Sequence, residues 1–285
     1  MHCGGYSIVW GLVLEPLAHP KPGGVTRCKS HPDKDIYDFV MGVYPALKAC
    51  KAACSGGCKG FIGRGLNSYI ESATRISKTN IQLGSVLLLL PLCRALHDSS
   101  TPGDLFRNAS RLVVACDSFE SGKAYYDALS LLGVGHLGWY EGVVPSVGSG
   151  EYPPGLVPAL EASRWDHVHN ELLSGYPLTA EAYRIMMERV NDGIEEAILT
   201  AILELLASHG DTLIARKWGM SAYLKALREA RYAKELSLRR GVRASLEYLD
   251  GLWRRRGWNP GAILDIVGVA SGVVYSVLMG ELVEG

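Results

Sequence analysis

The sequence predicts an all-α protein, and three observations support that fold class. Apolar residues recur every three to four positions along most of the chain, which is the spacing of one face of a helix. Runs that alternate apolar with polar residues, as a half-buried strand does, are almost absent. Hydrophobic residues make up 48% of the chain and charged residues 20%, which is typical of a folded globular protein. We therefore expect a single multi-helix globular domain over residues 1–285.

Several stretches show the helical spacing clearly, and some begin with recognisable start signals. Thr101 and Pro102 offer a capping side chain followed by a proline at the first helical position. Asn259 and Pro260 repeat that arrangement later in the chain. The predicted helices run from Ile36 to Ala53, Leu83 to Leu96, Leu105 to Cys116, Ala180 to Val190, Ile194 to Ala207, Ala222 to Leu236 and Val242 to Trp253.

A further apolar run, Ala262 to Met279, is about long enough to cross a membrane. It contains Asp265 near its start and the small residues Gly268 and Gly272 along its length. These residues favour a helix buried in a protein core over a membrane span. Because we also find no basic leader and only scattered cysteines, we expect a cytoplasmic protein.

The balance of charges limits the partners of the chain. Lys and Arg together number 29, and so do Asp and Glu. A chain without net charge has no global field that attracts nucleic acid or an acidic membrane surface. We therefore expect small-molecule partners, no nucleic acid and no membrane, with a homodimer left open. Any anionic ligand must be held by a local cluster of charges.

The most unusual segment is the proline- and glycine-rich loop from His19 to Arg27, between the first two helices. Prolines stiffen the chain there, while Gly23 and Gly24 let backbone N–H groups approach a ligand closely. Lys21 and Arg27 add positive charge. Such a loop suits a phosphate chain, although it lacks the lysine pattern of the P-loop. We expect it to form part of the active site; a stiff turn between helices is the alternative.

A short acidic cluster follows this loop. His31, Asp33 and Asp35 stand within five residues of one another. Carboxylate oxygens suit Mg²⁺, which usually keeps several waters and bridges the phosphates of a substrate. The alternative is a solvated helix start, because acidic residues are favoured beside a helix N-terminus.

Polar residues at the edges of very apolar helices form a second group of candidates. Asn80 and Gln82 precede the apolar run that begins at Leu83. They either cap that helix or contact a base or ribose, because a buried amide needs a hydrogen-bond partner. Asp265 is the one charged residue of its apolar run and therefore needs a cationic partner, such as a metal ion or a basic side chain.

Asp211 precedes two basic residues, Arg216 and Lys217, by about one and a half helical turns. A local ion pair is the simplest explanation of this spacing.

Two weaker patterns point to other chemistry. His97 and Asp98 form the dipeptide after which a class of helical metal-dependent phosphohydrolases is named, although further ligands in a persuasive arrangement are missing. Cys50, Cys54 and Cys58 recur every fourth residue, a spacing that could place them on one helix face as metal ligands. A second Gly- and Pro-rich stretch, residues 133–158, is predicted to be a lid or a long surface connection.

Taken in order, these segments resemble the motifs of the triphosphoribosyl-dephospho-coenzyme A synthase family. Each motif is weak by itself, but their order along most of the chain matches that of the family. The matching segments are His19 to Gly23, His31 with Asp33, Asn80 with Gly84, Gly175 to Pro177, Asp211 and Thr212 with the basic residues that follow, and Asn259 to Gly261 with Asp265.

The resemblance implies an ATP-dependent pentosyl transferase. Members transfer the triphosphoribosyl group of ATP to the 2′-hydroxyl of 3′-dephospho-coenzyme A and release adenine, which provides the precursor of a prosthetic group. The implied nucleotide-binding residues are Lys21, Gly23, Gly24, Arg27, Asn80, Arg216 and Lys217. The implied catalytic residues are Asp211, Asp33 and His31, and the implied Mg²⁺ ligands are Asp33, Asp35 and Asp265.

Departures from the family pattern leave the acceptor open. Ile81 and Gln82 replace the expected residues of the Asn80 motif, and the middle of the chain is more similar to the archaeal branch than to the citrate-lyase enzymes. Three alternatives therefore accompany the main prediction. They are ribosyl transfer to another cofactor precursor, a helical metal-dependent phosphohydrolase, and a nucleotide-binding module without turnover.

Overall fold

The computed structural model describes residues 6–76, 80–132 and 144–284, and within these ranges the secondary structure is helical, without strands. The all-α prediction is therefore confirmed. The α-helices are α1 (Gly11–Leu17), α2 (Ile36–Cys54), α3 (Phe61–Ala73), α4 (Leu83–Ala95), α5 (Pro102–Ala115), α6 (Phe119–Leu131), α7 (Leu156–Ala162), α8 (His167–Ser174), α9 (Pro177–Arg189), α10 (Ile194–His209), α11 (Thr212–Arg240), α12 (Val242–Arg255) and α13 (Gly261–Leu278). The short 3₁₀ helices are η1 (Ser7–Trp10), η2 (Leu96–Asp98) and η3 (Val190–Asp192).

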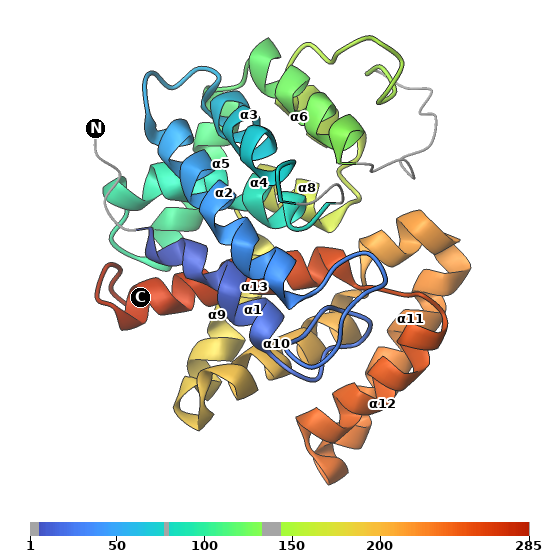
Figure 1. Ribbon diagram of the computed structural model, residues 1–285. Coiled ribbons are helices and arrows are strands. Elements are labelled where there is room, and N and C mark those ends of the chain that lie inside the picture. Colours follow the sequence, from blue (N-terminus) through green and yellow to red (C-terminus); the bar gives the residue numbers. More distant parts are fainter. Residues whose placement is uncertain (1–5, 77–79, 133–143, 285) are drawn as a thin grey trace.

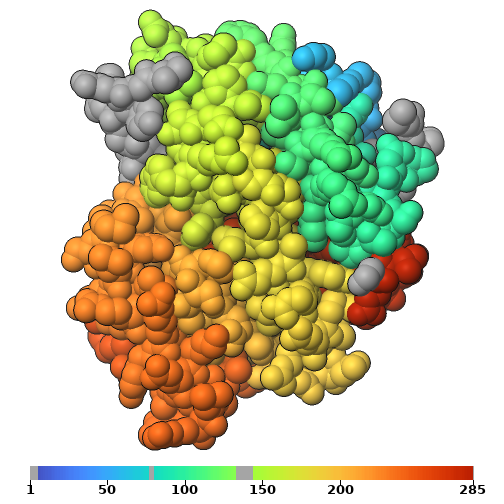
Figure 2. Space-filling view, turned by 180° about the vertical axis from the view of Figure 1, so that it is seen from behind, coloured from blue at the N-terminus to red at the C-terminus, as the bar shows by residue number. Residues whose placement is uncertain are grey.

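The helices are arranged around α13, which crosses the middle of the molecule (Figure 1). Helices α2 to α6 lie on one side of it, and α10 to α12 lie on the other, with α11 and α12 packed together as a pair. Seen from behind, α8 and α9 run down the centre between the green α5 and the orange α11 (Figure 2). One connected hydrophobic core joins both sides.

Helix α13 is the core helix that the sequence predicts. It is long and apolar enough to cross a membrane, but 72% of its apolar window is buried inside the protein. Its small residues allow close packing: a Cβ atom at Gly272 would overlap the carbonyl oxygen of Ile8, and one at Gly11 would overlap that of Gly268. The glycines therefore let η1 and α1 approach the backbone of α13 directly.

The predicted helix starts are only partly correct. Thr101 caps α5 as expected and accepts a hydrogen bond from the backbone N–H of Asp104 at 3.2 Å. The predicted cap at Asn259 is wrong, because α13 begins at Gly261, Pro260 takes the cap position and no side chain caps it. The carboxamide of Asn259 is left free for another partner.

A buried acid, Glu171, fixes the corner between α8 and α9. Its carboxylate accepts hydrogen bonds from the backbone N–H groups of Leu178 and Thr179, both at 2.8 Å. These two N–H groups belong to the first turn of α9, where a helix has no acceptors of its own. The corner residue Tyr176 adopts a left-handed backbone, with φ of 61°.

The cysteines join helices. Cys50 forms a disulfide with Cys93 of α4, and Cys58 forms one with Cys116 at the end of α5, with Cα–Cα distances of 5.8 and 5.2 Å. The metal site suggested for Cys50, Cys54 and Cys58 is therefore wrong, because all three sulfurs are in disulfide bonds. Of the loop predicted over 133–158, residues 133–143 lie outside the described residues, and α7 already begins at Leu156.

The contact between η1 and α13 gives a test of the fold. We expect Gly272→Ala to lower the free energy of unfolding by about 1–3 kcal/mol, because the new methyl group must displace backbone at Ile8. Thermal unfolding of the two proteins measures this difference. Gly251→Ala is the matched control: it lies inside α12, where the nearest atom to a new Cβ is 3.9 Å away. This control is expected to keep or raise the melting temperature, since alanine favours helix. Equal behaviour of the two variants would contradict the close packing of α13.

Candidate active site

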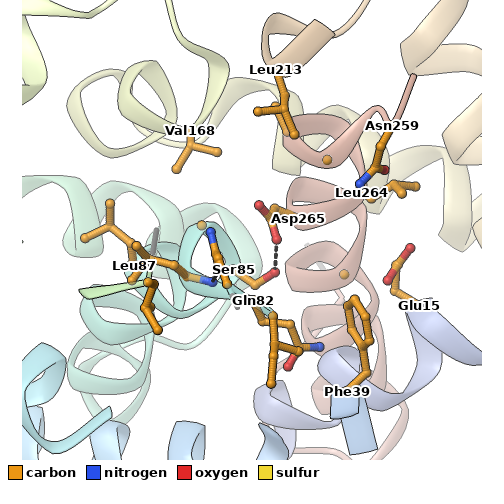
Figure 3. Close-up of a pocket in the computed structure, with 18 of the residues that line it drawn as sticks. Glu15, Phe39, Gln82, Ser85, Leu87, Val168, Leu213, Asn259, Leu264 and Asp265 are labelled. Carbon is orange, nitrogen blue, oxygen red and sulfur yellow. Dashed lines mark hydrogen bonds between the residues drawn. The ribbon is translucent and has the colours of Figure 1, made fainter. Parts of the chain in front are cut away.

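A cleft of about 310 Å³ opens beside the N-terminal half of α13 (Figure 3). It is lined by Ser85, in the first turn of α4, and by Asp265, in the second turn of α13. Residues of α1 and of the following loop line one end, and α6 and α8 line the other. The cleft therefore draws on segments from nearly the whole length of the chain.

Positive charge lines the cleft, and two of its four cations belong to the loop between α1 and α2. Lys21, Lys34, Arg216 and Lys217 all line the cleft. Lys21 is almost fully buried, forms an ion pair with Glu15, and donates to the carbonyl oxygen of the same residue at 2.9 Å. Burial lowers the pKa of Lys21, while the Glu15 carboxylate opposes that effect.

The other three cations differ in how fully they are paired. Lys34 donates to the carbonyl oxygen of Asn80 at 2.7 Å, and Arg216 bonds to Asp166 at 3.2 Å. Lys217 is exposed and makes no hydrogen bond or ion pair among the described residues. Desolvation, together with the charges of Lys34 and Arg216, lowers its pKa. These three cations are therefore close enough to repel one another, which an anionic ligand would relieve.

Asp265 lies at the centre of the cleft without a cation of its own. Its carboxylate accepts a hydrogen bond from the Ser85 hydroxyl, and a Cβ atom at Gly84 would overlap it. Loss of water contact raises the pKa of Asp265 from an ordinary 3.8 to about 7, and repulsion from Glu15 acts in the same direction. A carboxylate in this state gains from any positive charge that enters the cleft.

Three buried polar atoms along the cleft lack a hydrogen-bond partner among the described residues. They are Oε1 of Gln82, Nε of Arg216 and Oδ1 of Asn259. Buried polar atoms are normally paired with protein or with ordered water, so these three indicate groups that a ligand or water satisfies. Gln82 is held in place through its other end, since its Nε2 donates to the carbonyl oxygen of Leu12 at 3.0 Å.

The opposite end of the cleft is apolar. Its walls come from α4, α6, α8 and the start of α11, and its apolar lining residues are Leu87, Leu129, Leu132, Val168 and Leu213. Two polar side chains also reach it, Tyr125 and His169, whose Oη and Nε2 atoms are 2.5 Å apart. The charged pair of Asp166 and Arg216 lies close enough to act on both. Apolar walls with a few placed polar groups are typical of a small-molecule pocket.

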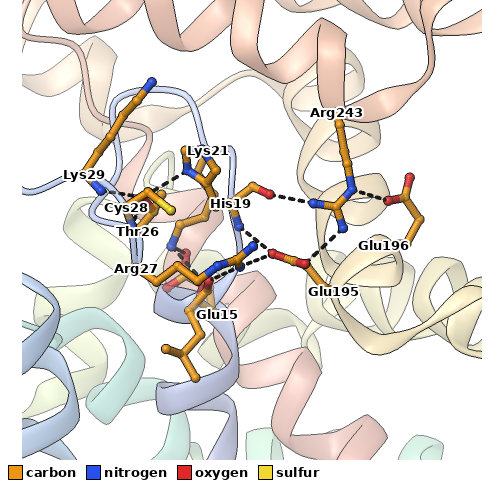
Figure 4. A network of polar contacts seen from close by, with 11 residues as sticks. Glu15, His19, Lys21, Thr26, Arg27, Cys28, Lys29, Glu195, Glu196 and Arg243 are labelled. Atoms are coloured by element: carbon orange, nitrogen blue, oxygen red, sulfur yellow. Dashed lines mark hydrogen bonds and ion pairs between the residues drawn. The ribbon is translucent and has the colours of Figure 1, made fainter.

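The loop between α1 and α2 is fixed from outside the cleft by two acidic residues. Asp250 of α12 accepts hydrogen bonds from the backbone N–H of Gly23 at 2.9 Å and from Lys29 at 2.6 Å. Glu195 of α10 bonds to Arg27 and to the backbone N–H of His19 (Figure 4). Although burial acts to raise it, the bonds from Arg27 and Arg243 lower the pKa of Glu195 to about 2. The loop is thus anchored to α10 and α12 by charge.

The structure brings together about half of the site residues that the sequence predicts. Lys21 comes from the loop between α1 and α2, and Asp265 comes from α13. Those that line the cleft are Lys21, Asp33, Asn80, Arg216, Lys217 and Asp265.

Asp211, expected to be a catalytic base, is not among the lining residues. Both of its carboxylate oxygens are occupied, because they accept the backbone N–H groups of Ile214 at 3.0 Å and Ile263 at 2.9 Å. It therefore joins the starts of α11 and α13, which is a structural position. Its role as a catalytic base stays a prediction.

The remaining predicted residues are also not among those that line the cleft. Asp35, an expected metal ligand, caps α2 by accepting from the N–H of Tyr37 at 2.8 Å. Arg27 turns outward to Glu195, and His31 lies 3.0 Å from the Gly23 carbonyl oxygen. Gly23 and Gly24 shape the loop: a Cβ at Gly23 would overlap the carbonyl oxygen of Trp258, and its φ is 68°.

Several lining residues were not identified from the sequence. Tyr125, Asp166 and His169 stand in segments without a recognised motif, and Glu15 sits in a helix that was not singled out. A weak signal existed for Asp166, because it precedes α8 as a cap residue and accepts the N–H of Val168 at 2.9 Å. The pairings of the others depend on contacts between distant helices.

A comparison with protein families decides between the functions considered so far. Residues 5–282 match the family model CitG, described as ATP:dephospho-CoA triphosphoribosyl transferase. The chain belongs to this family. It is therefore a transferase that uses ATP and dephospho-CoA, as the sequence motifs predict. The phosphohydrolase alternative loses its support, and neither His97 nor Asp98 lines the cleft.

The fold agrees with a solved structure. The crystal structure of a candidate triphosphoribosyl-dephospho-CoA synthase from Archaeoglobus fulgidus matches with a TM-score of 0.65 and 20% sequence identity. The match covers 84% of this chain and 97% of that chain. At that identity the likeness shows a shared fold. No curated protein matches the sequence.

The raised pKa of Asp265 gives a test of the site through stability. An acid whose pKa is about 7 when folded and about 4 when unfolded binds more protons in the folded state. Its ionisation therefore costs stability, fully above pH 7 and progressively less as the pH falls toward 4. We expect Asp265→Asn to raise the melting temperature relative to the natural protein at pH 8, with a gap that shrinks steadily toward pH 4.

Asp104 of α5 provides the control for this measurement. Hydrogen bonds from Thr101 and Arg107 lower the pKa of this exposed carboxyl, so its ionised form stabilises the fold. Asp104→Asn should therefore lower the melting temperature at pH 8, and the difference should vanish in acid. A loss of stability at pH 8 in Asp265→Asn would show that the Asp265 carboxylate serves the fold alone.

Proposed function

We propose that the cleft binds ATP across its length, with the triphosphate over the cationic end, the ribose at Asp265 and the base in the apolar end. The arrangement of the cleft supports this order. Its lining includes four cations, five apolar side chains and, near its centre, one carboxylate without a cation of its own, which suit a triphosphate, a base and a sugar that becomes positively charged. The transfer then joins the ribose to the 2′-hydroxyl of dephospho-CoA and releases adenine.

The chemistry at the centre explains why a carboxylate lies there. Breaking the bond between ribose and adenine passes through a state with positive charge on the sugar, as in glycoside hydrolysis. A carboxylate that has lost water contact stabilises such a charge more strongly than one in solution. The observation that carries the proposal is therefore Asp265, which is desolvated, repelled by Glu15, and hydrogen-bonded to the uncharged Ser85.

Mg²⁺ is proposed as the metal that accompanies ATP. Among the described residues, no group of three or more His, Cys, Asp or Glu side chains is arranged to hold a metal ion. Mg²⁺ needs fewer, since it is commonly held by one or two carboxylates together with substrate phosphates. Asp265 and Asp33 line the cleft and fit that role, whereas the Asp35 carboxylate is committed to the cap of α2. The bound ion would neutralise part of the triphosphate charge.

Chromatographic detection of adenine tests the proposed function. The protein with ATP and Mg²⁺ should release adenine when dephospho-CoA is added, and Asp265→Asn should lower that rate at least about 100-fold. Titrating Mg²⁺ during ATP binding to the variant separates the two roles of the carboxylate. Weaker Mg²⁺ dependence identifies a metal ligand, and unchanged dependence with lost release identifies a stabiliser of the sugar charge.

Other products would contradict the proposal. Adenine release that requires a different acceptor would replace dephospho-CoA with another cofactor precursor. Release of phosphate without adenine would support hydrolysis, and ATP binding without any product would support a nucleotide-binding module.

Lys217 offers a direct test of the cationic end. We expect Lys217→Ala to raise the dissociation constant of ATP about 5- to 30-fold, because a hydrogen bond to a charged group contributes about 1–2 kcal/mol. The loss should shrink as salt concentration rises. Lys51→Ala is the control, since Lys51 is equally exposed but lies on α2 away from the cleft. An unchanged dissociation constant in Lys217→Ala would remove this residue from the triphosphate site.

A cytoplasmic location remains part of the proposal. Disulfides are rare in most cytosolic proteins, but the intracellular proteins of hyperthermophiles are rich in them. The two disulfides between helices are therefore compatible with a cytoplasmic enzyme in a hyperthermophilic cell.

A further inference from the structure

We propose that Tyr125 selects the adenine base of ATP, and that His169 positions it for that task. This inference rests on the proposed function, because it takes the apolar end of the cleft as the base pocket. Tyr125 and His169 both line that end and are buried, with exposed fractions of 5% and 6%. Neither residue takes part in the steps described above.

The hydrogen bonds around His169 fix which nitrogen carries the proton. Its Nδ1 atom lies 2.7 Å from the Ser163 hydroxyl and 3.3 Å from the Ser163 carbonyl oxygen. A carbonyl oxygen only accepts, so Nδ1 must carry the hydrogen to bond to it. The Ser163 hydroxyl has its own acceptor, the carbonyl oxygen of Ala159 at 3.2 Å, and can therefore accept from Nδ1.

With the proton on Nδ1, the opposite nitrogen of His169 can only accept. Burial lowers the pKa of His169, which keeps the ring neutral. The Tyr125 hydroxyl must then donate to Nε2, at 2.5 Å. Its only hydrogen is used in this bond, and burial raises the pKa of the phenol, so the hydroxyl stays protonated.

The Tyr125 oxygen therefore presents only lone pairs to the cleft. A group that only accepts favours a base with a hydrogen-bond donor on its edge and disfavours one with a carbonyl oxygen at the same place. The exocyclic amino group of adenine is such a donor, whereas hypoxanthine and guanine carry a carbonyl oxygen there. The leucines of this region offer no donor or acceptor, and the charged residues that act on Tyr125, Asp166 and Arg216, bond to each other at 3.2 Å. We therefore assign the preference to the Tyr125 oxygen.

The test compares three nucleotides on the natural protein: ATP, ITP and purine riboside triphosphate, which lacks the amino group but adds no carbonyl. We expect ATP to bind about 10- to 100-fold more tightly than either analogue, the cost of leaving one buried polar group unpaired. The same ratio should appear in kcat/KM for base release. Equal affinities, or a preference for ITP, would overturn the assignment while ATP-dependent adenine release would still support the proposed function.

Two variants and a control separate selection from simple support of the fold. Tyr125→Phe should bind all three nucleotides alike, and His169→Leu should lower the preference for ATP, because the freed hydroxyl can turn and donate to a carbonyl oxygen. Tyr126→Phe is the matched control: it removes the hydroxyl next along α6, which bonds to the Pro145 carbonyl oxygen outside the cleft. This control should show the same preference for ATP over the two analogues as the natural protein.

Melting temperatures of the three variants report any loss of folding. A Tyr125→Phe protein that is folded and retains the full preference for ATP would refute the role of Tyr125. A His169→Leu protein that retains it would refute the positioning role of His169. The ratio in the natural protein needs no variant, so the absence of a preference for ATP overturns the proposal even where a variant does not fold.

Discussion

The burial of α13 is the constraint on which the rest of the structure depends. This helix is apolar along almost its whole length, so it must be covered on every side. Its glycines admit η1 and α1 at backbone distance, while α4, α9 and α10 pack against its other faces. Asp265, near the start of this helix, therefore lies in the interior, and the cleft forms around it.

Acidic and basic residues are equal in number in this protein, and where they lie in the fold determines how they are paired. The chain is neutral overall, yet its buried acids and bases collect at the loop, the helix corners and the cleft. At the loop and the corners each acid has its partners, as Asp250 and Glu171 show. In the cleft the pairing is incomplete, since Lys217 and Asp265 lack a partner of opposite charge among the described residues. A ligand that supplies the opposite charges would be favoured at this site.

Asp211 and Asp265 show how similar side chains acquire different roles. Burial raises the pKa of both to about 7. The oxygens of Asp211 are both occupied by backbone N–H groups at two helix starts, so the residue holds α11 and α13 together. Asp265 has one hydroxyl donor and faces the open cleft. A perturbed pKa marks both, and the accessibility of the oxygens decides which one can meet a substrate.

The sequence by itself determined the helical fold, the core helix α13 and the family, because periodic apolar spacing and ordered motifs are local features. It also indicated Lys21, Asn80 and Asp265, whose unusual surroundings are visible along the chain. Only the tertiary structure decided that Asp35 and Asp211 are caps, and that Tyr125 and His169 meet in the cleft. A cap and a catalytic acid have the same local sequence, since acidic residues are favoured at helix starts in either role. What separates them is the direction of each carboxylate relative to helices far away in the chain.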